Sequence, residues 1–390
     1  MSGLPPLTGA RRTVAAALTA ELVRRIAAAG PLPFEAYMDS ALYHPQWGYY
    51  MNPLPKFGAD GDFVTAPESG PLFGRLLAEH CRRWAAELGG ADLIELGAGS
   101  GALAEQLLAA LDAAGALPAR YGIVEPSPAL RALQKARAAA WPARWRARLC
   151  WFEAPPAEPW RAVVIANEVL DALPVARFVV GEDGRCRAEY VDWDAAAGRL
   201  RRVDGPPPPA LAEALAALAR SLPEPLPAGY RSEIALRLDG WFARLAAALE
   251  AGLVLLLDYG YPRAEYYHPQ RAAGTLRCHL AHRAHDDPLW APGAQDMGAH
   301  VDFSAAAAAA AAAGFTVAGF CTQADLLLGA GPAALEAALA AAPAERLRLA
   351  AQLKQLSWPG GMGETVKALA LVRNWPGPVP RLPADRRVRL

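Results

Sequence analysis

The stretch that decides the fold is Asp92-Leu-Ile-Glu-Leu-Gly-Ala-Gly-Ser-Gly101. Its apolar residues at positions 93, 94 and 96 predict a short buried strand, and its glycines at alternate positions predict a tight turn. Leucines then recur at helical spacing over residues 102–114, so a helix is expected after the turn. A strand, a glycine turn and a helix in this order allow backbone N–H groups to approach a ligand closely.

Similar short apolar segments recur along the chain and alternate with helical segments. The expected strands are 92–96, 121–124, 149–152, 162–166, 253–257, 315–320 and 368–372. Continuous apolar strands separated by helices are typical of a parallel sheet that is covered on both faces. The predicted fold class is therefore α/β, with one doubly wound sheet.

The rest of the chain consists of an N-terminal region and two insertions. The core of the sheet is expected over 89–176, 251–260 and 301–378, after an N-terminal helical region at 1–88. The first insertion, 177–250, contains an expected hairpin (177–180 with 187–191) and two expected helices (210–221 and 232–250); the second, 261–300, is rich in His, Pro and Gly. We expect the N-terminal region and the insertions to form a second lobe, in which the insertions bind the substrate.

Composition limits the classes of function. The chain has 390 residues, a length that predicts about two or three folding units. Of these residues 53% are hydrophobic, which is enough to bury a sizeable core. Lys plus Arg number 39, as do Asp plus Glu, and this balance argues against broad binding to nucleic acid or to an anionic membrane. Its 5 scattered cysteines lack a CxxC pair and fit free thiols in a reducing compartment. No run of about 20 strongly apolar residues predicts a membrane span.

Two acidic residues accompany the glycine turn. Glu95 comes two residues before the first glycine, where a carboxylate can meet the ammonium or ribose end of a cationic ligand; a pyrophosphate would gain nothing there. Glu125 follows the second expected strand, where a carboxylate can accept hydrogen bonds from both ribose hydroxyls. With Ala102 the turn also matches the GxGxxG/A pattern of dinucleotide sites, so a nicotinamide dehydrogenase and a turn without a ligand remain alternatives.

A second polar group follows the fourth expected strand. Asn167 and Glu168 come directly after its apolar residues. Open α/β sheets bind ligands at the carboxyl ends of their strands, so this pair is expected to converge with the two acids above on one crevice. Glu168 and Asp171 are three residues apart, which would place both on one face of a helical turn. The alternative is a helix capped by Asn167 with two exposed acids.

The glycine turn and the second-strand acid together resemble the class I S-adenosylmethionine methyltransferases. This resemblance implies a seven-stranded sheet whose last strand runs antiparallel. A closer resemblance, to the MidA-like family, runs in order over nearly the whole chain. Its motifs here include Tyr43-His-Pro45, Gly48-Tyr-Tyr50, Gly61-Asp-Phe-Val-Thr-Ala-Pro-Glu68, Phe73-Gly74, Val124-Glu-Pro-Ser-Pro128, Asn167-Glu-Val-Leu-Asp-Ala-Leu-Pro174, Asp258-Tyr-Gly260, Gly274-Thr-Leu-Arg-Cys278, His285-Asp-Asp-Pro288 and His300-Val-Asp-Phe303. One departure is Gly298, where the family pattern implies Thr.

The resemblance implies an enzyme that uses S-adenosyl-L-methionine to methylate arginine in a protein, which in the mitochondrial branch is a subunit of respiratory complex I. The residues expected to bind the cofactor are Glu95, Gly97, Ala98, Gly99, Gly101, Glu125 and Asn167, with Phe63 and Thr65 from a glycine-rich loop that closes as a lid. The alternatives are a weakly catalytic or non-catalytic assembly factor for a respiratory complex and a small-molecule methyltransferase. The composition, rich in Ala, Arg and Pro, favours a bacterial cytoplasmic protein; a eukaryotic one would be mitochondrial.

An arginine acceptor sets chemical requirements. Guanidinium has a pKa above ~12, so carboxylates must pair with it, aim one nitrogen at the methyl group and take up its proton. Glu168 and Asp171 are the first candidates, and Asp62 is another, unless it caps its own loop. Glu233 and Tyr259 are predicted to contact the substrate, although Tyr259 can equally be a packed aromatic residue.

Three histidines, His279, His282 and His285, recur at a spacing of three. No carboxylate or cysteine stands beside them in a standard metal-binding spacing. We therefore expect hydrogen bonds that fix a loop, and no metal site.

Overall fold

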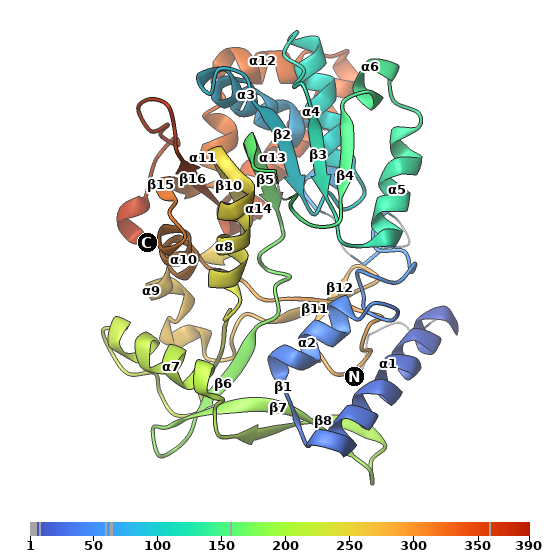
Figure 1. Cartoon of the computed structure of the whole chain (residues 1–390), viewed down its shortest axis with the longest axis vertical. Coiled ribbons are helices and arrows are strands. Elements are labelled where there is room, and N and C mark those ends of the chain that lie inside the picture. The colour runs from blue at the N-terminus through green and yellow to red at the C-terminus, as the bar shows by residue number, and fades with distance from the viewer. Residues whose placement is uncertain (1–5, 8, 59–60, 63–64, 157, 359) are drawn as a thin grey trace. The chain divides into compact units, whose positions relative to one another are not determined.

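The computed structural model describes residues 6–7, 9–58, 61–62, 65–156, 158–358 and 360–390 (Figure 1). The chain divides into two compact units. Unit 1 comprises Met1–Phe63, Asp171–Leu238 and Arg263–His300, and unit 2 comprises Val64–Leu170, Asp239–Pro262 and Val301–Leu390.

Unit 2 is built on one large sheet. Its strands are β2 (Asp92–Leu96), β3 (Tyr121–Val124), β4 (Leu149–Phe152), β5 (Trp160–Asn167), β10 (Leu249–Tyr261), β14 (Val301–Asp302), β15 (Thr316–Thr322) and β16 (Val366–Arg373). The order is β15-β16-β10-β5-β2-β3-β4, with β14 paired to β10. Neighbours from β4 to β10 are parallel, whereas β16 is antiparallel to both of its neighbours. The expected α/β sheet with an antiparallel last strand is confirmed: seven strands form the continuous order, and the two-residue β14 is an additional eighth.

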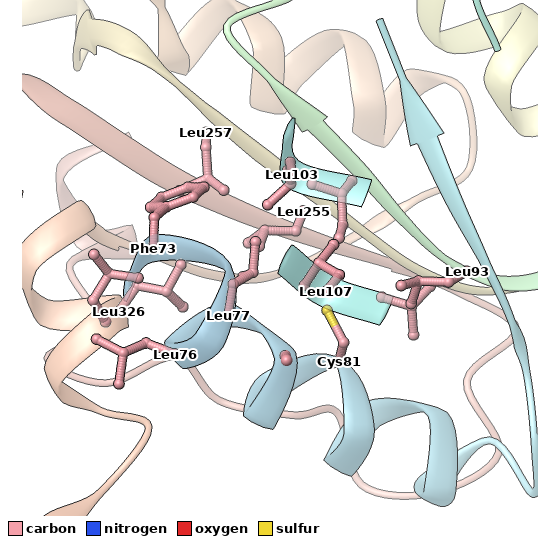
Figure 2. Close-up of a cluster of buried hydrophobic side chains, with 14 of the residues drawn as sticks. Phe73, Leu76, Leu77, Cys81, Leu93, Leu103, Leu107, Leu255, Leu257 and Leu326 are labelled. Atoms are coloured by element: carbon pink, nitrogen blue, oxygen red, sulfur yellow. The ribbon is translucent and has the colours of Figure 1, made fainter. Parts of the chain in front are cut away.

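Helices cover this sheet. They are α3 (Leu72–Glu87), α4 (Ala102–Ala113), α5 (Pro128–Ala138), α6 (Ala143–Arg146), α8 (Leu238–Ala248), α10 (Phe303–Ala312), α11 (Gln323–Leu328), α12 (Pro332–Leu339), α13 (Pro343–Ser357) and α14 (Met362–Thr365), with short 3₁₀ turns at Pro67–Ser69 and Arg387–Arg389. Leucines at helical spacing on α3 and α4 form one buried cluster with apolar residues of the strands. Figure 2 shows Leu77, Leu107 and Leu255 in this cluster, each fully buried. Burying one such side chain contributes about 1.5–3 kcal/mol, so this cluster fixes α4 behind the glycine turn.

Unit 1 holds two smaller sheets. The first contains β1 (Leu32–Pro33), β6 (Ala176–Val180), β7 (Cys186–Asp194), β8 (Arg199–Gly205) and β9 (Arg231–Ile234), and the second contains β11 (Arg277–Leu280), β12 (Arg283–His285) and β13 (Asp296–Gly298). All pairings in both sheets are antiparallel. The helices are α1 (Gly9–Ala29), α2 (Phe34–Tyr43), α7 (Pro209–Ser221) and α9 (Arg263–Tyr266), with a 3₁₀ turn at Pro269–Arg271.

The structure changes some expected boundaries. The expected hairpin is present as β6 and β7. The expected helix over 232–250 is wrong in its first part, because residues 231–234 form β9 against β6 and the helix begins only at Leu238. Residues 64–88 and 239–250 belong to unit 2 with the large sheet, not to the N-terminal region and the insertion in which they were expected. No helix in the described ranges has both the length and the apolar character needed to cross a bilayer.

Candidate functional site

The carboxyl ends of three neighbouring strands coincide in unit 2, at a level that the longer strand β10 also crosses. Leu96 of β2 is in register with Val124 of β3 and Ala166 of β5, and Ala166 is in register with Leu256 of β10. Four of the predicted site residues lie within two positions of this line: Glu95, Glu125, Asn167 and Glu168. The structure therefore brings these four residues to one edge of the sheet.

The glycine turn between β2 and α4 requires glycine. Gly97, Gly99 and Gly101 all have left-handed backbone angles, with φ values of 65°, 54° and 82°. A Cβ atom at Gly97 would lie 3.2 Å from Cγ2 of Val169, closer than ordinary packing. The side chain of Ala98 is buried in the core of unit 2, so only its backbone is suited to ligand contact. Because glycine has no side chain, a ligand can approach the backbone closely at the start of α4. The first N–H groups of a helix have no helical partners, which favours polar ligand atoms there.

Glu95 is a buried carboxyl group whose charge is disfavoured. It is 3% exposed, and its Oε2 atom accepts a hydrogen bond of 2.6 Å from the hydroxyl of Tyr121. Burial, with a smaller contribution from the charge of Glu125, raises the pKa of Glu95 to about 7. A positively charged ligand beside these two carboxyl groups would favour the ionised form, so the pair fits a cationic ligand such as S-adenosyl-L-methionine.

Glu125 is held by hydrogen bonds from α5 and from the residue that caps it. Its Oε1 atom accepts a hydrogen bond of 3.0 Å from the backbone N–H of Ser127, and its Oε2 atom accepts one of 3.2 Å from Nε2 of Gln134. The same Nε2 atom donates to the carbonyl of Gly99 at 3.0 Å, and Nε1 of Trp151 donates to Oε1 of Gln134 at 3.2 Å. Gln134 therefore links the second-strand acid to the glycine turn.

Sequence reasoning missed Gln134, although a signal was available. It lies between Leu130 and Ala138 at a spacing of four, on the buried face of α5. A polar residue in an apolar helical stripe must find hydrogen-bond partners inside the protein, and such a residue is a reason to look for a structured site.

The segment after β5 contains an unsatisfied polar atom. Nδ2 of Asn167 donates to Oε1 of Glu168 at 3.2 Å, while its Oδ1 atom is buried and has no hydrogen-bond partner among the residues that the structure describes. Buried acceptors normally have a partner, so this atom is suited to accept a hydrogen bond from a ligand. Glu168 has a φ of 53°, which is rare for a residue with a Cβ atom.

The helical turn expected to place Glu168 and Asp171 on one face is wrong. No helix of the described range 158–358 includes residues 168–171, because the left-handed angle at Glu168 directs the backbone away from a helical turn. Asp171 also belongs to unit 1, where its carbonyl accepts a hydrogen bond of 3.0 Å from the N–H of Ala299. Gly298 lies beside it, since a Cβ atom built there would be 3.5 Å from Oδ2 of Asp171.

Asp62 is a structural anchor of unit 1. It is fully buried, and its two oxygens face both terminal nitrogens of Arg11, at 2.9 and 3.0 Å. The hydroxyl of Tyr49 donates to Oδ2 at 2.9 Å, and the N–H of Ala281 donates to Oδ1 at 2.8 Å. These contacts occupy both oxygens, so the structure supports the alternative in which Asp62 fixes its loop and does not support a catalytic carboxylate.

Glu233 occupies a second buried ion-pair cluster of unit 1. Its Oε1 atom lies 3.2 Å from Nε of Arg177, and Oε2 accepts a hydrogen bond of 2.8 Å from the N–H of Thr275. Arg177 also pairs with Glu189 at 2.7 Å, and all three charged side chains are at most 5% exposed. This placement gives no support to the substrate-binding role predicted for Glu233.

The remaining predicted residues have simpler surroundings. Tyr259, near the end of β10, is half-buried and packs against the core of unit 2, while Thr65 is half-buried and its carbonyl accepts a hydrogen bond of 3.0 Å from the N–H of Glu68. Phe63 lies outside the described residues.

The three histidines lie on or beside one hairpin. Ala281 and His282 both have positive φ values, which is typical of the two-residue turn that joins β11 to β12. The backbone N–H of His282 donates to the carbonyl of Asp62 at 3.0 Å, and Nε2 of its ring lies 3.2 Å from the carbonyl oxygen of Gly58, so this turn is fixed to a loop. Across the described ranges, no three His, Cys, Asp or Glu side chains are grouped closely enough to hold a metal ion.

The chain is similar to known methyltransferases. Residues 72–321 match a family described as putative S-adenosyl-L-methionine-dependent methyltransferases. The chain is 30% identical over 328 residues to the mitochondrial protein arginine methyltransferase NDUFAF7 homolog of Drosophila melanogaster, covering 73% of this chain and 68% of the relative. For the mitochondrial protein arginine methyltransferase NDUFAF7 of Xenopus laevis the identity is 29% over 321 residues, covering 75% and 70%.

A solved structure extends this similarity to the whole chain. A protein from Burkholderia thailandensis, crystallised bound to S-adenosyl-homocysteine, is 37% identical with a TM-score of 0.90 over 100% of both chains. These findings overturn the dehydrogenase alternative. The chain belongs to this family of S-adenosyl-L-methionine-dependent methyltransferases, and S-adenosyl-L-methionine is its cofactor.

Proposed function

We propose that the chain methylates a side-chain nitrogen of arginine in a protein. The observation that carries this proposal is the position of Glu168, a carboxylate at the end of β5 on the same sheet edge as Glu95 and Glu125. The relatives from Drosophila melanogaster and Xenopus laevis, both named as protein arginine methyltransferases, support the choice of arginine.

In this proposal different residues at the sheet edge bind different parts of the cofactor. When bound, S-adenosyl-L-methionine supplies a methyl group activated by the positive sulfur. Glu125 accepts hydrogen bonds from the ribose hydroxyls, and Glu95 balances positive charge in a site of low dielectric. The unsatisfied Oδ1 atom of Asn167 accepts a further hydrogen bond from the cofactor.

In this proposal Glu168 binds the acceptor guanidinium and takes up its proton. A guanidinium group is protonated at neutral pH, so a carboxylate is needed to hold it and to take up a proton as the N–C bond forms and the methyl–sulfur bond breaks, its electron pair going to sulfur. Holding the nitrogen in line behind the methyl group is the larger contribution, since orientation can provide up to about 7–11 kcal/mol. The size of insertions 177–250 and 261–300 favours a protein acceptor, because a small molecule would need less surface.

The experiment compares the wild type with Glu168→Gln. Arginine-containing proteins are incubated with labelled cofactor, and mass spectrometry identifies the methylated residue. Glu168→Gln is expected to lower kcat about 100-fold or more, while the affinity for S-adenosyl-homocysteine in calorimetry stays within about threefold. Glu87→Gln, an exposed acid at the end of α3, is the matched control and should leave both quantities unchanged.

Other outcomes identify the alternatives. Cofactor binding without transfer to any protein would favour the assembly factor, whose cellular role Glu168→Gln would leave intact. Transfer only to small acceptors would favour a small-molecule methyltransferase. The narrower acceptor, a respiratory complex I subunit, and a cytoplasmic location belong to the same proposal. The complex I acceptor is tested by comparing methylarginine in respiratory complexes from cells with and without the gene.

A further inference from the structure

We propose that Asp258 is a positioning residue for methyl transfer: it holds the backbone after Glu168 so that the Glu168 carboxylate is presented to the acceptor. This inference rests on the proposed function for the role of Glu168. Asp258 itself lies in β10, on the neighbouring strand, ninety residues further along the chain.

The carboxylate of Asp258 is bonded to backbone N–H groups. It is 1% exposed, and its Oδ2 atom accepts hydrogen bonds from the N–H of Val169 at 3.1 Å and from that of Leu170 at 2.8 Å. Its Oδ1 atom accepts a third bond of 2.9 Å, from the N–H of Tyr259. A buried carboxylate bonded to backbone in this way orients a chain segment and is not placed to touch a substrate, so the role is positioning and not catalysis.

The segment that Asp258 holds is strained. Glu168 has a φ of 53°, and a residue with a Cβ atom keeps such an angle only where surrounding bonds impose it. The N–H of Glu168 donates to the carbonyl of Leu257 at 2.8 Å, and the next two N–H groups donate to Asp258. β10 therefore fixes three consecutive N–H groups, which is enough to determine the direction in which the Glu168 side chain leaves the backbone.

The same segment packs against the glycine turn. Cγ2 of Val169 would lie 3.2 Å from a Cβ atom at Gly97, so Val169 closes directly over that turn. The backbone at Glu168 is strained, lies next to the cofactor turn and is held from the neighbouring strand. This arrangement is expected where local strain serves the chemistry. Without Asp258 the backbone at Glu168 would relax to a commoner angle and move its carboxylate.

The test combines amide hydrogen exchange with a double-mutant cycle. Asp258→Asn keeps the size of the side chain but places an NH₂ group against N–H donors. We expect exchange at the amides of Val169 and Leu170 to become about tenfold faster or more, and kcat to fall about tenfold or more, while KM for S-adenosyl-L-methionine stays within about threefold. In the Glu168→Gln background, Asp258→Asn should lower kcat no further, because its effect passes through Glu168.

Asp385→Asn is the matched control. The Oδ1 atom of Asp385 also accepts two backbone hydrogen bonds, from Phe320 at 3.0 Å and Arg387 at 3.1 Å, on edge strand β15 and the C-terminal segment. This variant should leave exchange at residues 169–170 and kcat unchanged. A comparable loss of kcat in Asp385→Asn, or an undiminished loss from Asp258→Asn in the Glu168→Gln background, would overturn the positioning role and show a general structural effect.

The two proposals fail in different ways. A wild type that methylates no arginine overturns the proposed function, and amide exchange still decides whether Asp258 holds the segment. Exchange that stays unchanged in Asp258→Asn overturns the inference about Asp258, even where the wild type methylates arginine normally.

Discussion

The hydroxyl of Tyr121 donates a hydrogen bond of 2.6 Å to Glu95, and both side chains are almost completely buried. This bond favours the ionised carboxylate, yet burial and the nearby charge of Glu125 outweigh it and raise the pKa of Glu95 to about 7. Glu95 therefore changes between its neutral and its ionised form near neutral pH. A bound cation shifts it towards the ionised form, which couples occupancy of the site to its protonation.

The contribution of Glu95 to the stability of the ligand-free protein should fall as pH rises from about 4.5 to about 7. The pKa of Glu95 is raised from 4.5 to about 7, so the folded state keeps a proton that the unfolded state releases, and raising the pH favours unfolding. Glu95→Gln should therefore be more stable than the wild type at about pH 8, by about 1–3 kcal/mol, and no more stable at about pH 4. Denaturant unfolding across this range measures the difference.

Unit 1 provides an internal reference for that experiment. Burial raises the pKa of Asp296 to about 7 as well, and this residue is unchanged in Glu95→Gln, so the pH dependence should be reduced and not abolished. S-adenosyl-homocysteine carries a positive ammonium group and should bind the wild type more tightly as pH rises through about 7, but bind Glu95→Gln equally at all pH values in this range. Identical pH profiles for both proteins would contradict the role of Glu95.

Alanine at Gly97 should cost both stability and cofactor affinity. The left-handed angle of 65° strains any residue with a Cβ atom by about 1–2 kcal/mol, and here that atom would also meet Val169. Gly89→Ala is the matched control, because its φ is 74° but its Cβ atom would have open space around it. Thermal unfolding should show a loss in both variants. Calorimetry with S-adenosyl-homocysteine should show weaker binding, by about tenfold or more, only in Gly97→Ala, and equal affinities would contradict the importance of the close approach.

Much of the fold is readable from local sequence because apolar runs mark buried strands. The strands at 92–96, 121–124 and 149–152 have the expected bounds, and the bounds of the other expected strands of the large sheet differ by only a few residues. β9, Arg231–Ile234, lies where a helix was expected and has little apolar character of its own. It is a strand because β6 pairs with it, and no local pattern reports that pairing.

The site residues also fall into those that local sequence predicts and those that it does not. Glu95, Glu125, Asn167 and Glu168 were predictable because each follows or ends an apolar strand, and parallel strands bring their carboxyl ends to one edge. The roles of Gln134 and Asp258 depend on which backbone groups lie beside them in space, and these groups are distant in the chain.

Asp62→Asn should destabilise the protein. The variant removes the carboxylate that lies 2.9 Å from the Arg11 guanidinium, which is 7% exposed, and breaking a buried pair from one side costs about 3–5 kcal/mol. Denaturant unfolding measures this loss. Asp192→Asn, which removes a similar pair with Arg201 on the protein surface, is the control and should leave stability unchanged within error. Asp62→Asn should also retain kcat per folded molecule; a stable variant with kcat lowered about 100-fold would restore the catalytic prediction for Asp62.

Gln134→Ala should weaken cofactor binding through Glu125 and the glycine turn. The substitution removes hydrogen bonds to Glu125, Gly99 and Trp151 inside the protein, and leaving such groups unsatisfied costs about 1–3 kcal/mol. The affinity for S-adenosyl-homocysteine should fall by about tenfold, whereas Gln355→Ala on the exposed face of α13 should change neither stability nor affinity. Gln134→Glu separates geometry from charge, because it keeps the length of the side chain but faces Glu125 with a second carboxyl group. It should raise the pH needed for tight binding, and a variant that binds as the wild type does at every pH would show that Gln134 only fills the core.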